Sequence, residues 1–262
     1  MSNNAIEQFK IERRDRIKQY ATDGEFNSRS SAWISKSIEE KYVYNFDWLG
    51  RPIIQYPQDM AAVQELVWTV KPDLIIETGI AHGGSLMLSA SMLALLDVCD
   101  AAHDGKSLDP RNPKRKVLGV DIDIRSHNRV AIETHPLAHY IEMIQGSSIA
   151  EDTISQIRER AAKAKTVMIF LDSNHTHDHV LAELEAYAPL VHPGSYCVVF
   201  DTFVEQLPKS AFPDRPWGPG DNPMTAVRAF LSSHPEFAVD EMIDRKLQIT
   251  AAPGGYLRRL PS

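Results

Sequence analysis

Four acidic residues of this chain, Glu77, Asp121, Asp172 and Asp201, each follow a short apolar run. A single acid in such a position usually caps a helix or forms a turn. Four of them favour another interpretation, because the carboxyl ends of parallel strands share one edge of a sheet. We therefore expect these carboxylates to converge on one ligand-binding crevice.

The first acid opens a glycine-rich stretch, Glu77-Thr78-Gly79-Ile80-Ala81-His82-Gly83-Gly84-Ser85. Glycine lets the backbone turn sharply and approach a ligand that a Cβ atom would obstruct. An apolar helix is expected over 85–96, and its N-terminus would offer free N–H groups to a carboxylate or phosphate. A single glycine-rich turn is weak evidence by itself, and this spacing is not that of a dinucleotide-binding fingerprint.

A second group of candidate residues lies in the run Asp172-Ser173-Asn174-His175-Thr176-His177-Asp178-His179. A loop that caps the next helix would explain Asp178 without any chemistry. Clustered histidine and aspartate side chains could instead bind a transition metal. We favour a third interpretation, in which Asp172 is a ligand of a hard divalent cation and His175 is a general base that deprotonates a sugar or catechol hydroxyl.

The elements that must position these residues alternate between strand and helix. Strands are expected over 74–77, 117–121, 140–144, 167–171 and 196–200, with helices over 58–70, 85–96, 128–133, 150–164, 178–190 and 224–231. This alternation predicts a parallel sheet with right-handed crossovers. Segments 237–241 and 247–250 would add a closing antiparallel pair. The expected fold is α/β, with a mostly parallel seven-stranded sheet and helices on both faces.

The spacing Glu77-x-Gly79-x-x-x-Gly83-x-Ser85 resembles a motif of class I S-adenosylmethionine-dependent methyltransferases. Longer stretches resemble the cephalosporin hydroxylase family, which is grouped with the rhamnosyl O-methyltransferases and is similar to macrolide sugar O-methyltransferases. These stretches are YNFDWLGRPIIQYPQD, KPDLIIETGIAHGGSLMLSASML, FLDSNHTHDHVLAELEAYAPLV, GPGDNPMTAVRAFL and GGYLRRL, and they span about residues 40–260. The resemblance implies a Rossmann-like class I methyltransferase fold and S-adenosylmethionine as cofactor.

The resemblance also implies which residues bind that cofactor. The glycine-rich turn matches the one that cradles its methionine part, Asp121 matches an acid that accepts hydrogen bonds from both ribose hydroxyls, and the stretch after 140–144 lies where the family holds adenine. The expected cofactor-binding residues are Glu77, Gly79, Gly83, Ser85, Asp121, Ser147, Ser148 and Asp172.

The expected catalytic residues are His175 and Asp172, and the expected metal ligands are Asp172 and Asp201. The family often ends its fifth strand in Glu-Asp-Thr, whose two acids complete a Mg²⁺ site. Here the strand ends in Phe200-Asp201-Thr202, so one acid is missing and the affinity for Mg²⁺ should fall. Glu205 could replace it from the following loop.

Residues 1–57 precede this methyltransferase domain, which we expect over 58–262. Residues 1–22 predict a charged amphipathic helix, and 23–40 a serine-rich loop that could order over a ligand. The aromatic segment 42–57 either packs beneath this arm or forms a wall of the cofactor pocket. The candidates for such a wall are Asn45, Trp48, Gln55 and Tyr56.

Composition narrows the possible partners. The net charge of −7 argues against a nucleic-acid-binding surface, and no apolar run approaches membrane-spanning length. Cys99 and Cys197 both lie in apolar settings, which predicts buried thiols in a reducing cytoplasm. We expect a cytoplasmic homo-oligomer without a membrane span or a nucleic-acid partner. The N-terminal helix is expected to be an exposed packing arm, and the alternatives are a role in dimerisation or in covering the active site.

The favoured function is an S-adenosylmethionine-dependent O-methyltransferase that acts on a hydroxyl of a sugar or glycosylated metabolite, with possible assistance from Mg²⁺. One alternative is a metal-dependent hydroxylase or oxidoreductase, for which Asp172, His175 and His177 would have to form a facial metal site. Another is a non-catalytic partner subunit that retains cofactor binding, which Phe200 at a family ligand position would favour. The retention of both Asp172 and His175 argues against this last alternative.

Overall fold

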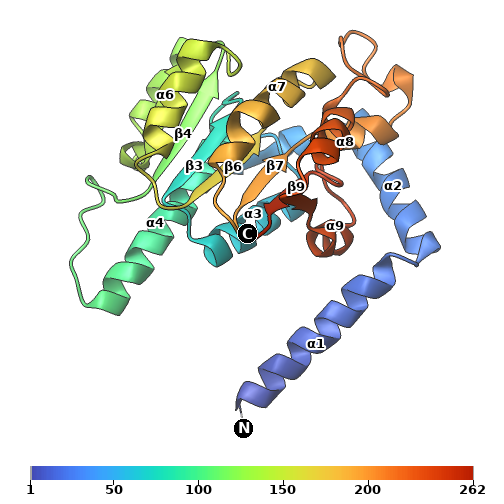
Figure 1. The fold of residues 1–262 in the computed structure, drawn as a ribbon, viewed down its shortest axis with the longest axis horizontal. Helices are drawn as coiled ribbons and strands as arrows, with labels where there is room; N and C mark the ends of the chain where they lie inside the picture. Colours follow the sequence, from blue (N-terminus) through green and yellow to red (C-terminus); the bar gives the residue numbers. More distant parts are fainter. Residues whose placement is uncertain (1, 262) are drawn as a thin grey trace.

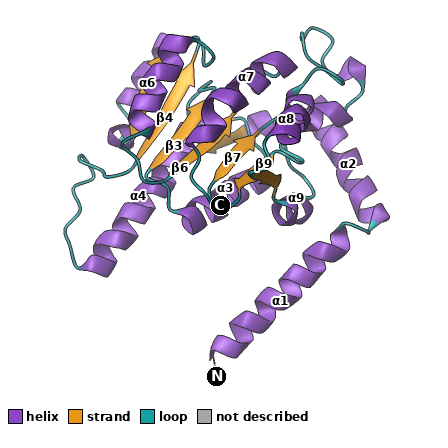
Figure 2. Ribbon diagram, in the orientation of Figure 1, coloured by secondary structure: helices purple, strands orange, loops and turns teal. Residues whose placement is uncertain are grey.

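The structure, a computed structural model, describes residues 2–261. Its centre is a seven-stranded sheet with the order β5-β4-β3-β6-β7-β9-β8, and helices cover both of its faces (Figures 1 and 2). The parallel strands are β3 (Leu74–Thr78), β4 (Lys116–Asp121), β5 (Ile141–Gln145), β6 (Val167–Leu171) and β7 (Tyr196–Val199). The antiparallel strands are β8 (Phe237–Val239) and β9 (Tyr256–Arg259). The predicted fold class is confirmed.

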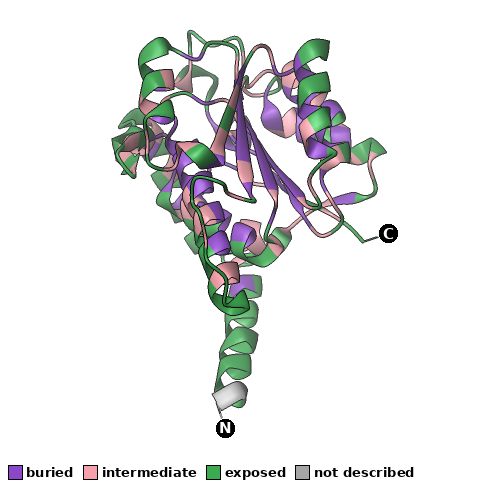
Figure 3. Cartoon of the chain, turned by 90° about the vertical axis from the view of Figure 1, so that its left-hand side faces the viewer, coloured by how far each residue is buried: buried purple, intermediate pink, exposed green. Residues whose placement is uncertain are grey.

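The helices of the main body are α3 (Pro57–Val70), α4 (Gly84–Asp104), α5 (Ser126–Glu133), α6 (Glu151–Ala161), α7 (His177–Tyr187), α8 (Pro223–Ser233) and α9 (Glu241–Leu247). Before them come α1 (Ser2–Tyr20), α2 (Gly24–Glu39) and a hairpin of β1 (Phe46–Trp48) and β2 (Arg51–Ile53). The exposed helix α1 extends away from the body as an arm (Figures 1 and 3). It contacts the body near α9.

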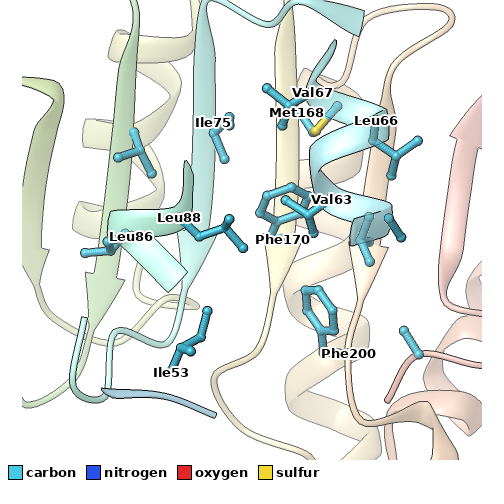
Figure 4. Packing of buried hydrophobic residues seen from close by; sticks show 14 of the residues in the cluster. Ile53, Val63, Leu66, Val67, Ile75, Leu86, Leu88, Met168, Phe170 and Phe200 are labelled. Carbon is cyan, nitrogen blue, oxygen red and sulfur yellow. The ribbon is translucent and has the colours of Figure 1, made fainter. Parts of the chain in front are cut away.

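The sheet separates two apolar cores, because successive strand residues point to opposite faces. Ile75 of β3 packs in the core beneath α3 and α4, whereas its neighbour Ile76 packs in the core beneath α6, α7 and α8. Figure 4 shows the first core, where Phe170 and Phe200 lie near Val63 of α3. The sheet that carries the site is thereby packed between helices on both faces.

Residues 23–40 form helix α2, so the predicted loop is wrong. Asp23 caps the helix by accepting a hydrogen bond from the backbone N–H of Phe26. The serines that suggested a loop instead bond to backbone carbonyls one turn earlier, as Ser31 does to Asn27. Trp33 then packs against the rings of Tyr42 and Tyr56, which fixes α2 on the aromatic segment.

The predicted strand over 247–250 is also wrong, because the closing strand is β9, further along the chain. Asp240 caps the short helix α9 by accepting from the N–H groups of Met242 and Ile243. This helix follows β8 and ends at Leu247, and the next segment, which includes Ile249, packs against the core without entering the sheet. Cys197 is buried as expected, but Cys99 is exposed on α4.

The expectation that no apolar run approaches membrane-spanning length is wrong, because among the described residues one helix, α4, is long and apolar enough to cross a membrane by length and composition. Its first turns are buried against the sheet, and 44% of the apolar window lies inside the fold. A core helix of a globular domain meets the same two criteria, so this feature is weak evidence for a span.

Candidate functional site

Three of the four predicted acids reach the carboxyl edge of the sheet. Asp121 ends β4, Asp172 follows β6, and Asp201 follows β7. Glu77 is the exception, because it lies one residue before the end of β3 with its side chain against α4. It is 3% exposed, accepts hydrogen bonds from Ser89 and Ser85 of α4, and lines the hollow between α3, α4 and the sheet.

The glycine-rich turn is shaped by positive backbone angles. Gly79 has φ 89° and Gly83 has φ 86°, a region that only glycine adopts without strain. The N–H of Gly79 donates to the carbonyl of Val120 on the neighbouring strand, 2.8 Å away. A Cβ atom on Gly79 would overlap the backbone carbonyl of Asp172. The turn and the Asp172 loop therefore approach each other as closely as two backbones can.

Replacing Gly79 with alanine should lower the free energy of unfolding by more than the strain of a positive φ alone, which is about 1–2 kcal/mol. Gly194 provides the matched control, because it has φ 86° and a Cβ atom added there would meet no atom within 4 Å. Urea denaturation would measure both variants. Equal losses for Gly79→Ala and Gly194→Ala would contradict the close approach.

Asp121 ties this turn to β4. Its Oδ2 accepts hydrogen bonds from the backbone N–H groups of Ile80, at 2.8 Å, and Ala81, at 3.3 Å, while Oδ1 accepts from the N–H of Asp123 at 3.0 Å. A carboxylate has about four acceptor positions. The side chain can therefore hold the turn and still accept from hydroxyl groups in the crevice.

Two side chains that the sequence analysis missed support the turn from outside. Asn128 of α5 donates to the carbonyl of Ala81, and Arg51 of β2 donates to the carbonyl of His82. Arg51 also donates to Asn128 Oδ1 at 2.7 Å, which joins the two supports. No sequence motif indicated them, because their role depends on the hairpin folding back over the turn.

The predicted adenine contacts differ from each other. Ser148 is 4% exposed, and its hydroxyl lies 3.0 Å from Nε2 of His179 on α7. Its carbonyl accepts a hydrogen bond from Tyr187. The Ser148 hydroxyl is thus committed to α7, whereas Ser147 is half-buried just after β5.

Of the predicted wall residues, one borders the interior of the site. Gln55 lines a small hollow between α3, α4 and the sheet, together with Glu77, Ser85 and Asp172. Trp48 donates instead to Ser91, and Tyr56 is fully buried beside Ser37. Asn45 is exposed and bonds to the carbonyl of Tyr42. The last three residues pack or cap local structure.

Burial raises the pKa of Glu77 from 4.5 to about 7, although hydrogen bonds from Ser89 and Ser85 act in the opposite direction. Between pH 4.5 and about pH 7 the Glu77 side chain is ionised in the unfolded chain but protonated in the folded protein. The free energy of unfolding therefore falls as the pH rises through this interval. Between pH 5 and pH 8 this should lower the free energy of unfolding by about 2–3 kcal/mol. Glu77→Gln should remove that decline in urea denaturation, whereas the exposed control Glu236→Gln should retain it.

Asp172, His175 and Asp201 meet in one cluster, in which one potential ligand atom from each residue lies within 4.8 Å of the others. Asp201 has a left-handed backbone conformation, with φ 57°. Its Oδ2 lies 3.3 Å from Nδ1 of His175. Burial and the nearby Asp201 carboxylate raise the pKa of Asp172 well above its usual value.

The other histidines of the polar run lie outside this cluster. Nδ1 of His177 is 2.8 Å from the hydroxyl of Thr225 on α8, and its backbone N–H donates to Asp221. Nε2 of His179 is within hydrogen-bonding distance of the hydroxyls of Ser148 and Ser173. The facial site that the hydroxylase alternative requires, with Asp172, His175 and His177, is therefore not formed.

Trp217 is a further site residue that the sequence analysis missed. Its ring meets the His175 ring edge to face, with 5.1 Å between centroids, and Phe212 packs on it in turn at 4.8 Å. Both aromatics belong to the proline-containing loop after β7, which has no regular pattern. An aromatic pair in a loop that follows a catalytic strand is the signal that could have pointed to it.

The donor set decides which metal ions the cluster suits. Phe200 stands where the family often has a glutamate that binds the metal. It is 5% exposed and packs against Phe170, so this position contributes to the apolar core. Glu205 does not replace it, because that carboxylate accepts from Gly220 and Asn222 and pairs with Arg228. Asp172 and Asp201 remain, and two carboxylates with water are sufficient to hold Mg²⁺ weakly.

Comparisons with known proteins agree with this architecture. The family model described as "Rhamnosyl O-methyltransferase/CmcI" matches residues 40–260. The rhamnosyl O-methyltransferase of Mycobacterium tuberculosis is 27% identical over 243 residues, covering 88% of this chain and 87% of that protein. The corresponding protein of Mycobacterium leprae is 28% identical over 233 residues, covering 86% and 90%. A solved structure of CmcI with Mg and S-adenosylmethionine superposes with a TM-score of 0.53 at 17% identity, covering 83% of this chain and 78% of that one.

Proposed function

Because this chain belongs to the rhamnosyl O-methyltransferase/CmcI family, we propose that it methylates a hydroxyl of a sugar or of a glycosylated metabolite. It is an S-adenosylmethionine-dependent O-methyltransferase. The observation that carries the proposed chemistry is the placement of the His175 imidazole beside Asp201, at the sheet edge that the glycine-rich turn also borders.

The residues at this edge fit the cofactor. The turn at Gly79 admits the close backbone approach that a bound molecule requires, and Asp121 has acceptor positions left for ribose hydroxyls. Ser147 and the backbone of Ser148 lie after the next strand, where adenine would be held. When bound, S-adenosylmethionine supplies an electrophilic methyl group.

His175 is oriented to accept the proton of the acceptor hydroxyl. The carboxylate of Asp201 next to Nδ1 favours the tautomer that carries its proton on Nδ1, which leaves Nε2 as the basic atom. Asp201 also stabilises the imidazolium that forms after proton transfer, as the third group of a catalytic triad does. A divalent ion at Asp172 and Asp201 would lower the pKa of the same hydroxyl.

Trp217 provides a wall for the acceptor. A half-buried indole beside the base offers the apolar, rigid surface against which a sugar ring can stack. The carboxylates of Asp172 and Asp201 would repel a strongly anionic acceptor. Both features favour a neutral glycoside.

Trp217→Ala should raise the KM for the acceptor by about tenfold, since an aromatic contact contributes roughly 1 kcal/mol or more. The affinity for S-adenosylmethionine should stay within a factor of two to three of the wild type, roughly the scatter of neutral substitutions. Trp68→Ala is the control, because Trp68 is 51% exposed on α3 and lies outside the site residues. An unchanged acceptor KM in steady-state kinetics would remove Trp217 from the binding wall.

The proposed function is tested with S-adenosylmethionine carrying a labelled methyl group and three acceptor classes. Rhamnosides, other neutral hexosides and a catechol would be compared, with the site of methylation located by mass spectrometry. We expect label on a sugar hydroxyl. Preferential methylation of the catechol would contradict a sugar acceptor.

We also propose a cytoplasmic homo-oligomer in which α1 packs against a second copy. Support comes from the exposed apolar side chains of Ile6 and Phe9 on an arm that extends from the body. Light scattering of the full chain in solution would measure the number of subunits directly.

A further inference from the structure

We propose that Asp172, His175 and Asp201 form a binding site that prefers a divalent transition ion such as Zn²⁺ over Mg²⁺, and that such an ion blocks methyl transfer by engaging His175. The preference concerns metal binding alone. The block rests on the proposed function, in which His175 is the base.

The chemistry of the donors carries the first step. Mg²⁺ selects oxygen ligands, whereas imidazole suits Zn²⁺ and its neighbours in the first transition series. The third position around the two carboxylates is filled by the His175 nitrogen, because Phe200 packs into the core and Glu205 is engaged by Gly220 and Asn222. Two aspartates and one histidine thus replace an all-oxygen set.

The geometry fits an ion of this size. Zn²⁺ binds nitrogen and carboxylate oxygen at about 2.0–2.2 Å, so two ligands of one tetrahedral ion lie about 3.4 Å apart. Nδ1 of His175 and Oδ2 of Asp201 are 3.3 Å apart. All three ligand atoms are within 4.8 Å of one another, so small side-chain rotations would bring them to a common ion.

Three protein ligands leave positions open for water or for an acceptor hydroxyl, as in catalytic zinc sites. The neighbouring histidines do not complete the set, because His177 is held by Thr225 and His179 by Ser148. Trp217 packs against the His175 ring and limits its rotation away from the aspartates.

Occupation of the site has a defined consequence for His175. An ion bound to Nδ1 forces the ring proton onto Nε2, and that nitrogen then has no lone pair with which to accept a proton. Mg²⁺ held by the two carboxylates would leave the imidazole free. The two kinds of ion should therefore have opposite effects on methyl transfer.

The test uses the full chain and Co²⁺ as a spectroscopic substitute for Zn²⁺. We expect one Co²⁺ to bind per chain and to give visible absorption bands. Zn²⁺ should displace the Co²⁺ and remove these bands. A hundredfold excess of Mg²⁺, roughly 2.7 kcal/mol of competing free energy, should leave them unchanged. His175→Ala should weaken Zn²⁺ binding by at least roughly 10- to 100-fold. Loss of a residue that only hydrogen-bonds to a metal ligand already has an effect of this size. The matched control His177→Ala should bind Zn²⁺ like the wild type.

Displacement of Co²⁺ by Mg²⁺ at comparable concentration, or unchanged Zn²⁺ affinity in His175→Ala, would overturn the site. Retained cofactor binding shows that each variant is folded. Stoichiometric Zn²⁺ should abolish methyl transfer by the wild type, and full activity of the Zn²⁺-loaded protein would overturn the block. If Zn²⁺ binds through His175 but no acceptor is methylated either by metal-free protein or by protein supplied with Mg²⁺, the proposed function fails and the metal site stands.

Discussion

His175→Gln should lower the kcat of methyl transfer by about 100- to 10,000-fold, the usual contribution of a positioned general base. Glutamine fills a similar volume but cannot accept the proton of a hydroxyl group at neutral pH. The affinity for S-adenosylmethionine should be unchanged, because the contacts of His175 are with Asp201 and Trp217, away from the glycine-rich turn and Asp121. Single-turnover kinetics would measure the chemical step separately from binding.

His177→Gln is the matched control for this prediction. It lies two residues further along the chain, at the first residue of α7, and its imidazole bonds to Thr225 on α8. A loss of kcat in His177→Gln equal to that in His175→Gln would assign the effect to disturbance of the loop. A shared loss of cofactor affinity would lead to the same conclusion.

Asp121→Ala should weaken the binding of S-adenosylmethionine by about 100-fold or more. The variant loses the oxygens available to the ribose, and hydrogen bonds to a charged group contribute roughly 1.5–3 kcal/mol each. It also releases the N–H groups of Ile80 and Ala81, which hold the turn in shape. Both effects act on the same crevice, so isothermal titration should detect them together.

Asp123→Ala separates these effects from general loss of negative charge. Asp123 is exposed and contributes its backbone N–H to Asp121, which alanine retains. Its affinity for the cofactor should match that of the wild type. A similar loss in Asp123→Ala would indicate a long-range charge effect in place of direct contact by Asp121.

The parallel strands and the convergence of acids could be predicted because each rests on a local signal. Strand β6 begins and ends where the apolar run from Val167 to Leu171 does, and Asp172 follows it directly. The sheet topology then brings Asp172 and Asp201 together without any further information from the sequence. The cluster that they form with His175 lies at the predicted edge of the sheet.

The errors arose where tertiary contacts decide the structure. The serines of α2 are neutral to helix formation, and packing of Trp33 on Tyr56 determines the outcome. Glu77 lies one residue inside β3 and not at its end, and its side chain bonds to Ser89 of α4 and lines the hollow there. The closing strand β9 was missed because its position depends on pairing with both β7 and β8.

The parts of the site that lie in loops were the hardest to predict. Trp217 comes from an irregular segment, and its contact with His175 joins residues 42 positions apart that no periodic pattern relates. Arg51 reaches the turn only because the β1–β2 hairpin folds over α4. Sequence motifs identify such a crevice from its strand ends, whereas its walls require the structure.

The most direct test of the central claim is calorimetric titration of the wild-type protein with S-adenosylmethionine and S-adenosylhomocysteine. A crevice built from the glycine-rich turn and Asp121 should bind both at one site per chain, with dissociation constants in the micromolar range, about −8 kcal/mol. The absence of binding by either compound, in protein whose cooperative unfolding shows it to be folded, would contradict the account.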